Sequence, residues 1–274
     1  MSDKSRAIGV FDSGLGGLTA IKQLKRILPS EHFIYFGDTG RVPYGTRSFE
    51  TVIQYADDDM RFLMSFDIKA AVVACGTVSA VALPSLEKKF SLPIIGAISP
   101  ACHAASKISK NKKIAVFATP ATISKNAYNA HLNSIDPEIC IFPVACPMFV
   151  PLIECGYISK DSHATRIIAA EYLSKLCGTG ADTLILGCTH YPIISELISS
   201  VSKEVLGYEI NIIDSGLEAA YATKTLLEEK DLLNTETACG KVDFYVSDET
   251  QNFKNTASIF LGEQAENVTK VSIG

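Results

Sequence analysis

The sequence lacks several features that would place a chain in a common class at once. No apolar run approaches the ~18 residues that cross a bilayer, and the first residues lead into a strand pattern without a signal-peptide segment. The net charge of −5 leaves no basic surface for nucleic acid. With 47% hydrophobic and 20% charged residues, we expect a soluble cytoplasmic protein with neither a membrane nor a nucleic-acid partner.

Cysteine is present, but not in the spacing of a structural metal site. The 8 cysteines include no Cys-x-x-Cys pair, and an intracellular chain of 274 residues does not depend on disulfides. We therefore expect no metal. Cys140 and Cys177 are predicted to be small buried hydrophobes. Cys75 and Cys188 differ from them, because polar loops follow both.

Short apolar runs alternate with helical patterns, which is typical of βα units around a mainly parallel sheet. Strands are predicted at 7–11, 33–36, 70–74, 93–98, 114–117, 139–144, 183–186 and 210–213. Helices are predicted at 18–28, 49–63, 124–132 and 161–177, with a break near Pro84 and a turn region at 147–154. No linker or low-complexity tract separates these elements.

An internal repeat predicts two related halves. The Asp-Ser-Gly-Leu of residues 12–15 recurs at 214–217, a strand leading to a cysteine occurs twice, and another apolar strand follows each cysteine. We expect two closely apposed, pseudo-symmetric α/β domains with mainly parallel central sheets. The first would comprise residues 1–98 and 212–274, and the second residues 99–211.

The two cysteines at strand ends are the strongest candidates for chemistry. Open α/β sheets place their ligands where strands open into loops, and a thiol becomes reactive as its thiolate. If the halves face each other, Cys75 and Cys188 flank one ligand. One thiolate could then remove a proton from a tetrahedral carbon, while the other thiol returns one to the opposite face. His190 either activates Cys188 or simply starts a helix.

Other polar loops follow the predicted strands, and each has two interpretations. Residues 12–17 fit neither G-x-G-x-x-G nor a P-loop, so they either bind a small carboxylate or form a tight turn that caps a helix. Loop 37–46, with Tyr44 held between Pro43 and Gly45, is a moderate binding signal. Thr119 and Thr122 bind ligand oxygens or cap the next helix.

Glu154 closes an unusually apolar stretch that begins at Cys146. Apolar surroundings would raise the pKa of its carboxyl group, whereas an exposed position at a helix end would leave it without a role. The sequence leaves both interpretations open.

Taken in order, the motifs resemble those of the glutamate racemase family. They are Phe-Asp-Ser-Gly-Leu-Gly-Gly-Leu at 11–18, Gly-Asp at 37–38, Pro-Tyr-Gly at 43–45, Ala-Cys at 74–75 with Thr77, Ala-Thr at 118–119 with Thr122, Cys-Pro at 146–147, Pro-Leu-Ile-Glu at 151–154, Gly-Cys-Thr-His-Tyr-Pro at 187–192, and Asp-Ser at 214–215. The resemblance extends over essentially the whole chain, including Phe-Leu-Gly at 260–262.

This resemblance implies a cofactor-independent racemase that supplies D-glutamate for peptidoglycan, with its site in the cleft between two α/β domains and commonly a homodimer. It implies Cys75 and Cys188 as the acid/base pair, with Asp12 assisting Cys75, and Glu154 and His190 assisting Cys188. The implied substrate-binding residues are Asp12, Ser13, Tyr44, Gly45, Gly76, Thr77, Thr119, Thr122, Thr189 and His190.

The chain departs from the family pattern at two places. Gly76 stands where the family has Asn, and Ala-Ile-Ser-Pro at 97–100 stands where it has Val-Ile-Glu-Pro. Losing the amide of Asn removes hydrogen bonds worth about 0.5–1.5 kcal/mol each. Two alternatives therefore stay open: a racemase for another small amino acid, with Gly76 making room for it, or a relative that binds an amino acid without converting it.

Overall fold

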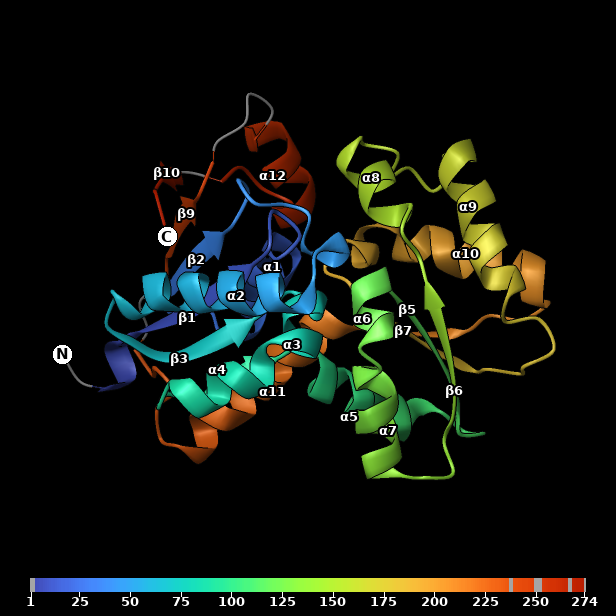
Figure 1. Cartoon of the computed structure of the whole chain (residues 1–274), viewed down its shortest axis with the longest axis horizontal. Helices are drawn as coiled ribbons and strands as arrows, with labels where there is room; N and C mark the ends of the chain where they lie inside the picture. Colours follow the sequence, from blue (N-terminus) through green and yellow to red (C-terminus); the bar gives the residue numbers. More distant parts are fainter. Residues whose placement is uncertain (1–2, 237–238, 249–252, 266–267, 274) are drawn as a thin grey trace.

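The computed structural model describes residues 3–236, 239–248, 253–265 and 268–273, and its strands form two separate sheets (Figure 1). The first sheet has six strands in the order β10-β9-β2-β1-β3-β4, and the second has four in the order β6-β5-β7-β8. All strand pairings in the described residues are parallel. We call the parts of the molecule around these sheets the first and the second lobe.

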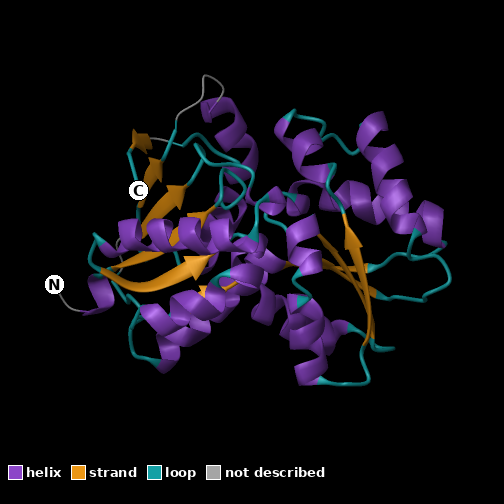
Figure 2. Cartoon of the chain, viewed as in Figure 1, coloured by secondary structure: helices purple, strands orange, loops and turns teal. Residues whose placement is uncertain are grey.

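Helices surround both sheets (Figure 2). The strands are β1 Ala7–Asp12, β2 Phe33–Gly37, β3 Ile68–Val73, β4 Ile94–Gly96, β5 Lys113–Ala118, β6 Cys140–Ala145, β7 Thr183–Leu186, β8 Asn211–Asp214, β9 Val242–Val246 and β10 Val268–Lys270. The helices are α1 Leu18–Ile27, α2 Phe49–Met64, α3 Gly76–Val81, α4 Leu83–Lys89, α5 Ile98–Ile108, α6 Pro120–Ser124, α7 Ala127–Ile135, α8 Phe149–Glu154, α9 His163–Ser174, α10 Ser195–Leu206, α11 Ser215–Glu229 and α12 Phe253–Leu261. Short 3₁₀ turns occupy Asp3–Ser5, Tyr44–Thr46 and Tyr191–Ile194.

The two lobes share one strand order, which confirms the predicted pseudo-symmetry. The run β2-β1-β3-β4 matches β6-β5-β7-β8 position for position, so β3 and β7 are equivalent. Cys75 follows β3 and Cys188 follows β7, so the two cysteines lie at corresponding strand ends. The Asp-Ser-Gly-Leu repeat is not part of this symmetry, because one copy follows β1 and the other follows β8, which corresponds to β4.

Strand membership also bears on the expected domain boundary between residues 211 and 212. That position lies inside β8, which pairs with β7 in the second sheet. The division into domains remains a proposal, and strand pairing favours a crossing after Asp214. The chain then returns to the first lobe through α11, which packs against α1.

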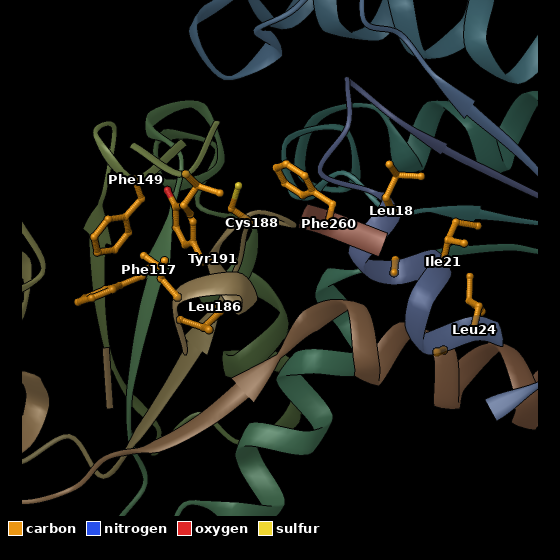
Figure 3. Packing of buried hydrophobic residues seen from close by; sticks show 14 of the residues in the cluster. Leu18, Ile21, Leu24, Phe117, Phe149, Leu186, Cys188, Tyr191 and Phe260 are labelled. Carbon is orange, nitrogen blue, oxygen red and sulfur yellow. The ribbon is translucent and has the colours of Figure 1, made fainter. Parts of the chain in front are cut away.

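Strands that are buried on both faces contribute to two apolar clusters, and these clusters connect the lobes. In β1, Ile8 and Val10 belong to one apolar cluster, whereas Phe11 belongs to the other. In β5, Phe117 and Val116 are divided between the same two clusters. Each cluster therefore runs from one lobe into the other, as expected for parallel strands covered on both sides. Figure 3 shows Phe117 and Leu186 of the second lobe in the cluster that contains Leu18 and Leu24 of α1.

Several sequence expectations need correction. The region 147–154 is not only a turn, because Phe149 and Ile153 bury one face of α8. The strand expected at 93–98 is shorter, since Ile98 begins α5 and proline is tolerated in a first helical turn. The helix expected at 124–132 is divided between α6 and α7 by Asn126, whose φ of 59° is left-handed. The break near Pro84 is confirmed by the division between α3 and α4.

Two cysteines expected in the core are exposed. Cys140 begins β6, the edge strand of the second sheet, so one side of it faces no neighbouring strand. Cys177 lies in the turn after α9, beyond the last buried turn of that helix. Among the described helices, none combines the length and the apolar character needed to cross a bilayer.

Candidate active site

A cavity of about 380 Å³ lies between the lobes, where β1, β3, β5 and β7 end in polar loops. This is the size of a small-molecule site. The predicted site residues that line it are Ser13, Tyr44, Gly45, Cys75, Gly76, Thr77, Thr119, Glu154, Cys188, Thr189 and His190. Asp12 and Thr122 are buried behind this lining. Folding thus gathers residues that are as far apart in the sequence as Ser13 and His190 around one cavity.

Cys188 belongs to a chain of three polar groups. Its Sγ lies 3.8 Å from Nδ1 of His190, and Nε2 of the same ring lies 3.0 Å from Oε1 of Glu154. Burial of the imidazole opposes its charge, but hydrogen bonds with Cys188 and Glu154 outweigh burial and raise the pKa of His190 to about 10. An imidazolium at this position can donate to a Cys188 thiolate and to the carboxylate together.

The surroundings of Cys75 are different. Its Sγ donates to Oγ of Ser13 at 3.4 Å. Burial and the negative charge of Asp12 raise the pKa of Cys75 to about 12. A neutral thiol is therefore the stable form of Cys75 at neutral pH, and it can act as a proton donor. Equivalent strands thus deliver two thiols into unlike environments.

Asp12 connects the lobes from behind the cavity. Its Oδ2 accepts from the backbone N–H of Gly14 at 3.0 Å, and its Oδ1 accepts from Oγ1 of Thr189 at 3.5 Å. Burial raises the pKa of Asp12, although His190 and these hydrogen bonds oppose the effect. In the part of the chain that the structure describes, Asp12 makes no hydrogen bond to Cys75, so the carboxyl group influences this thiol through its charge.

Three threonine hydroxyls meet across the boundary between the lobes. Oγ1 of Thr77 lies 3.0 Å from Oγ1 of Thr119 and 3.3 Å from that of Thr122. The hydroxyl of Thr119 also accepts from the backbone N–H of Thr122 at 3.4 Å and so caps α6. Thr119 therefore caps a helix as one interpretation predicted, and it also lines the cavity, where its binding of ligand oxygens stays a prediction.

Tyr44 does not present its hydroxyl group to the cavity. The phenol donates to Asp38, and it lies 3.0 Å from Oδ2 of Asp59, so its oxygen is engaged within the first lobe. Arg41 completes this cluster through Asp38 at 2.5 Å and Asp59 at 3.0 Å. The network holds the loop that carries Gly45, whose Cβ, if one were added, would lie 3.2 Å from Cβ of Thr119.

The missing side chain of Gly76 opens no space for a larger substrate. A Cβ built at this position would lie 2.2 Å from the carbonyl oxygen of Gly187. The side-chain side of Gly76 is therefore occupied by main chain of the second lobe.

Some residues around the site were not identified from the sequence. Thr19, on the first turn of α1, donates from Oγ1 to the carbonyl of Thr189 at 2.8 Å. The ring of Phe260, from α12, packs edge-on against His190 with a centroid distance of 5.0 Å, and Figure 3 shows Phe260 in the buried cluster that contains Cys188. The only sequence signal for Phe260 was its place in a segment shared with the resembled family. Within the described residues, no group of His, Cys, Asp and Glu is arranged to hold a metal ion.

Two parallel α/β lobes with a thiol at each of two equivalent strand ends define a class of enzymes whose site lies between the lobes. A family model for Asp/Glu/hydantoin racemases matches residues 8–223. The chain is 41% identical to a glutamate racemase of Geobacter metallireducens over 268 residues, which covers 98% of this chain and 97% of the relative. Many other curated glutamate racemases are similarly related, including one of Chlorobaculum parvum at 43% identity over 97% of this chain and 96% of the relative.

Solved structures agree with this relationship. A glutamate racemase of Francisella tularensis, solved in complex with D-glutamate, superposes with a TM-score of 0.90 at 39% identity and covers 98% of each chain. A glutamate racemase of Bacillus anthracis superposes with a TM-score of 0.92 at 37% identity, again over 98% of each chain. The chain belongs to the Asp/Glu/hydantoin racemase family. The resemblance seen in the sequence and the predicted fold class are both confirmed.

Proposed function

We propose that this racemase interconverts L- and D-glutamate without a cofactor, using Cys75 and Cys188 as the two acid/base groups. One observation carries the proposal: equivalent strands bring the two thiols to one cavity, where Cys75 contacts Ser13 and Cys188 contacts a histidine paired with a carboxylate. The proposal also draws on the full-length similarity to glutamate racemases.

In one direction, the Cys188 thiolate removes the α-proton and becomes a thiol, while the C–H electron pair stays at Cα and spreads into the carboxylate. Cys75 then gives its S–H proton to the opposite face of Cα, which forms the new C–H bond and leaves a Cys75 thiolate. The reverse reaction exchanges these roles. His190, held by Glu154, hydrogen-bonds the sulfur of Cys188, and the charge of Asp12 disfavours the thiolate of Cys75.

The substrate is held by polar groups at the strand ends. Ser13, Thr77, Thr119 and Thr189 offer hydroxyl groups at the cavity, and Gly45 and Gly76 offer backbone groups. Tyr44 contributes by fixing the loop that carries Gly45. Thr122 acts through Thr119, and Asp12 acts through Thr189.

The same resemblance leads us to propose a cytoplasmic homodimer that supplies D-glutamate for peptidoglycan. Sedimentation of the purified protein tests the dimer. Rescue by this chain of bacteria that require added D-glutamate tests the cellular role.

The decisive experiment measures solvent exchange. The purified protein is incubated in deuterated water with L-glutamate or D-glutamate and no added cofactor, and the α-proton signal is followed by NMR. We expect loss of this signal together with loss of optical activity. Absence of exchange with both enantiomers at high enzyme concentration would refute the proposed reaction.

Single cysteine variants test the assignment of roles. Cys75→Ser and Cys188→Ser should each lower the racemisation rate by about 10²- to 10⁴-fold, the usual contribution of a positioned acid or base. Cys140→Ser is a matched control, because this thiol is exposed on an edge strand. Near-normal racemisation by either site variant would contradict the two-thiol mechanism.

A second candidate is a racemase for another small amino acid, or a relative that binds one without converting it. The observation that favours it is Gly76, which offers no side-chain amide to the ligand. A panel of amino-acid enantiomers, each assayed for exchange and for binding by calorimetry, separates these functions from glutamate racemisation.

A further inference from the structure

Two glycines face each other where the lobes meet, and each adjoins a site cysteine. Gly76 directly follows Cys75 at the end of β3, and Gly187 directly precedes Cys188 at the end of β7. A Cβ added to Gly76 would lie 2.2 Å from the carbonyl oxygen of Gly187, 3.3 Å from its carbonyl carbon and 3.9 Å from Cα of Cys188. The first of these distances is far below van der Waals contact, so one lobe would have to move.

Gly187 is fixed by two neighbours in the second lobe. Its N–H donates to the carbonyl of Phe117 at 2.8 Å, which ties it to β5. The ring of Tyr128 packs against it, because a Cβ added to Gly187 would lie 2.8 Å from the Tyr128 hydroxyl and 2.9 Å from its Cε2. Tyr128 is itself a buried residue of α7. A shift of the segment that leads to Cys188 would therefore disturb both contacts.

Gly76 is equally constrained on its own side. It is the first residue of α3, all six residues of which are buried. Cys75 is the N-cap of the same helix, so any displacement of Gly76 also moves the first thiol. A side chain at position 76 would consequently change the distance between the two thiols rather than be absorbed locally.

We propose that Gly76 is a positioning residue that sets the separation of Cys75 and Cys188 by allowing main chain of one lobe to contact main chain of the other. This inference rests on the proposed racemisation. In this chain, the absence of a side chain at position 76 is a requirement of the closed site. A single methyl group there displaces Cys188 and impairs proton transfer.

This proposal and a simple loss of the amide predict opposite results for one substitution. If Gly76 only deprives the substrate of hydrogen bonds, Gly76→Asn restores them and improves kcat/KM. If Gly76 sets the closure, both Gly76→Asn and Gly76→Ala carry the Cβ that collides with Gly187. Both variants then lose activity to a similar degree.

The test compares kcat and KM for glutamate in Gly76→Ala, Gly76→Asn and the unmodified enzyme. We expect both variants to lose about 10- to 100-fold in kcat, because a misplacement of about 1 Å can cost on the order of 100-fold in rate. KM is expected to change less than kcat. Gly40→Ala is the control, since Gly40 is exposed and the nearest atoms to its added Cβ would be in Ser247 and Asp248, at 3.2 and 3.4 Å. A gain in kcat/KM for Gly76→Asn, or unchanged kcat for Gly76→Ala, would overturn the proposal.

A second measurement does not depend on activity. Hydrogen–deuterium exchange of the free protein should increase at residues 76–81 and 187–191 in Gly76→Ala and stay unchanged in Gly40→Ala. This result supports closure by Gly76 even if glutamate proves to be the wrong substrate. Unchanged exchange in both segments counts against closure even if the unmodified enzyme racemises glutamate.

A substitution of Tyr128 provides a third test, which applies if Gly76→Ala folds poorly. Tyr128→Leu removes the ring that packs against Gly187 and gives this residue space to move. The added Tyr128→Leu substitution should therefore recover part of the folded protein and of the kcat lost by Gly76→Ala, as coupling between neighbouring sites. Fully additive losses in the double variant would show that Tyr128 does not restrict the movement of Gly187, and this would refute the proposal.

Discussion

Nε2 of His190 lies 3.0 Å from Oε1 of Glu154, across the gap between the end of β7 and the end of α8. Through the same ring, Nδ1 reaches the sulfur of Cys188 at 3.8 Å. The imidazole thereby links a half-exposed carboxylate to a buried thiol. In this orientation the imidazole can hold a proton close to Cys188, and it keeps the thiol apart from the carboxyl group of Glu154.

The first prediction concerns the alkaline limb of the pH–rate profile. The His190 pKa of about 10 lies above its ordinary value, so the imidazolium persists at neutral pH and is lost as the pH rises through about 10. Glu154→Gln removes a group that raises this pKa. The alkaline decline of kcat/KM should therefore move to lower pH.

Racemisation rates measured from pH 6 to 11 check this expectation. Glu171→Gln, on the exposed side of α9, is the control and should leave the profile in place. An unchanged alkaline limb in Glu154→Gln would mean that the carboxylate does not support the charge of His190.

The second prediction concerns the buried cluster beneath the loop of Gly45. Burial and the charge of Asp38 raise the pKa of Asp59, and the phenol of Tyr44 donates to Asp38 and lies 3.0 Å from Oδ2 of Asp59. Tyr44→Phe should lower the free energy of unfolding by about 1–3 kcal/mol, because a buried carboxylate loses its donor. Thermal denaturation followed by circular dichroism measures the loss. Tyr157→Phe, at an exposed tyrosine, should leave the Tm unchanged.

The third prediction concerns the threonine cluster. Thr77→Val keeps the shape of the side chain and removes the hydroxyl that faces Thr119 and the cavity. A lost hydrogen bond of about 0.5–1.5 kcal/mol corresponds to an increase in KM of roughly 2- to 10-fold with kcat less affected. Steady-state kinetics with both enantiomers provide the test, with the exposed Thr225→Val as control. A fall in kcat alone would assign Thr77 to the geometry of Cys75 instead of substrate binding.

The fourth prediction concerns a buried ion pair far from the cavity. Nζ of Lys69 lies 2.6 Å from Oε2 of Glu31, and both side chains are almost fully buried. Lys69 also donates to the carbonyl groups of Lys4 and Leu232. Lys69→Met should destabilise the protein by about 3–5 kcal/mol, because it leaves a buried carboxylate without its cation.

Chemical denaturation measures that loss. The double variant Lys69→Met/Glu31→Leu removes both charges and should recover much of the stability. Failure of the second substitution to restore any stability would show that the carbonyl contacts of Lys69, rather than its charge pair, hold this region.

The positions of the two thiols were predictable because each depends on the residues that directly precede it in the sequence. Each lies directly after a short apolar strand, and parallel strands end at the same edge of a sheet. The pattern of β3 and β7 therefore predicted both the fold class and the meeting of Cys75 with Cys188. Thr119 was also placed correctly at the end of β5, where it caps α6 and lines the cavity.

Contacts between distant segments were beyond the sequence patterns. Tyr44 lies in a typical binding loop, yet its hydroxyl is engaged by Asp59, which α2 brings back from 15 residues along the chain. Thr19 lies outside the apolar positions of α1, and nothing in their spacing indicates its bond to Thr189, 170 residues away. The repeated Asp-Ser-Gly-Leu was misleading because such turns recur at many strand ends, whereas equivalence depends on strand order.

During synthesis, β2 stays an edge strand of the first sheet until the C-terminal part of the chain has been made. The second sheet is built from the continuous stretch 113–214, so it can assemble as soon as that stretch has left the ribosome. In the first sheet, β2 receives its outer neighbour only from β9, near the C-terminus. Until then, a fully apolar strand presents unpaired backbone groups, the kind of edge that joins wrong partners in growing chains. The lobe that is translated first is therefore the last to be finished, and it is the one that nascent-chain chaperones would need to protect.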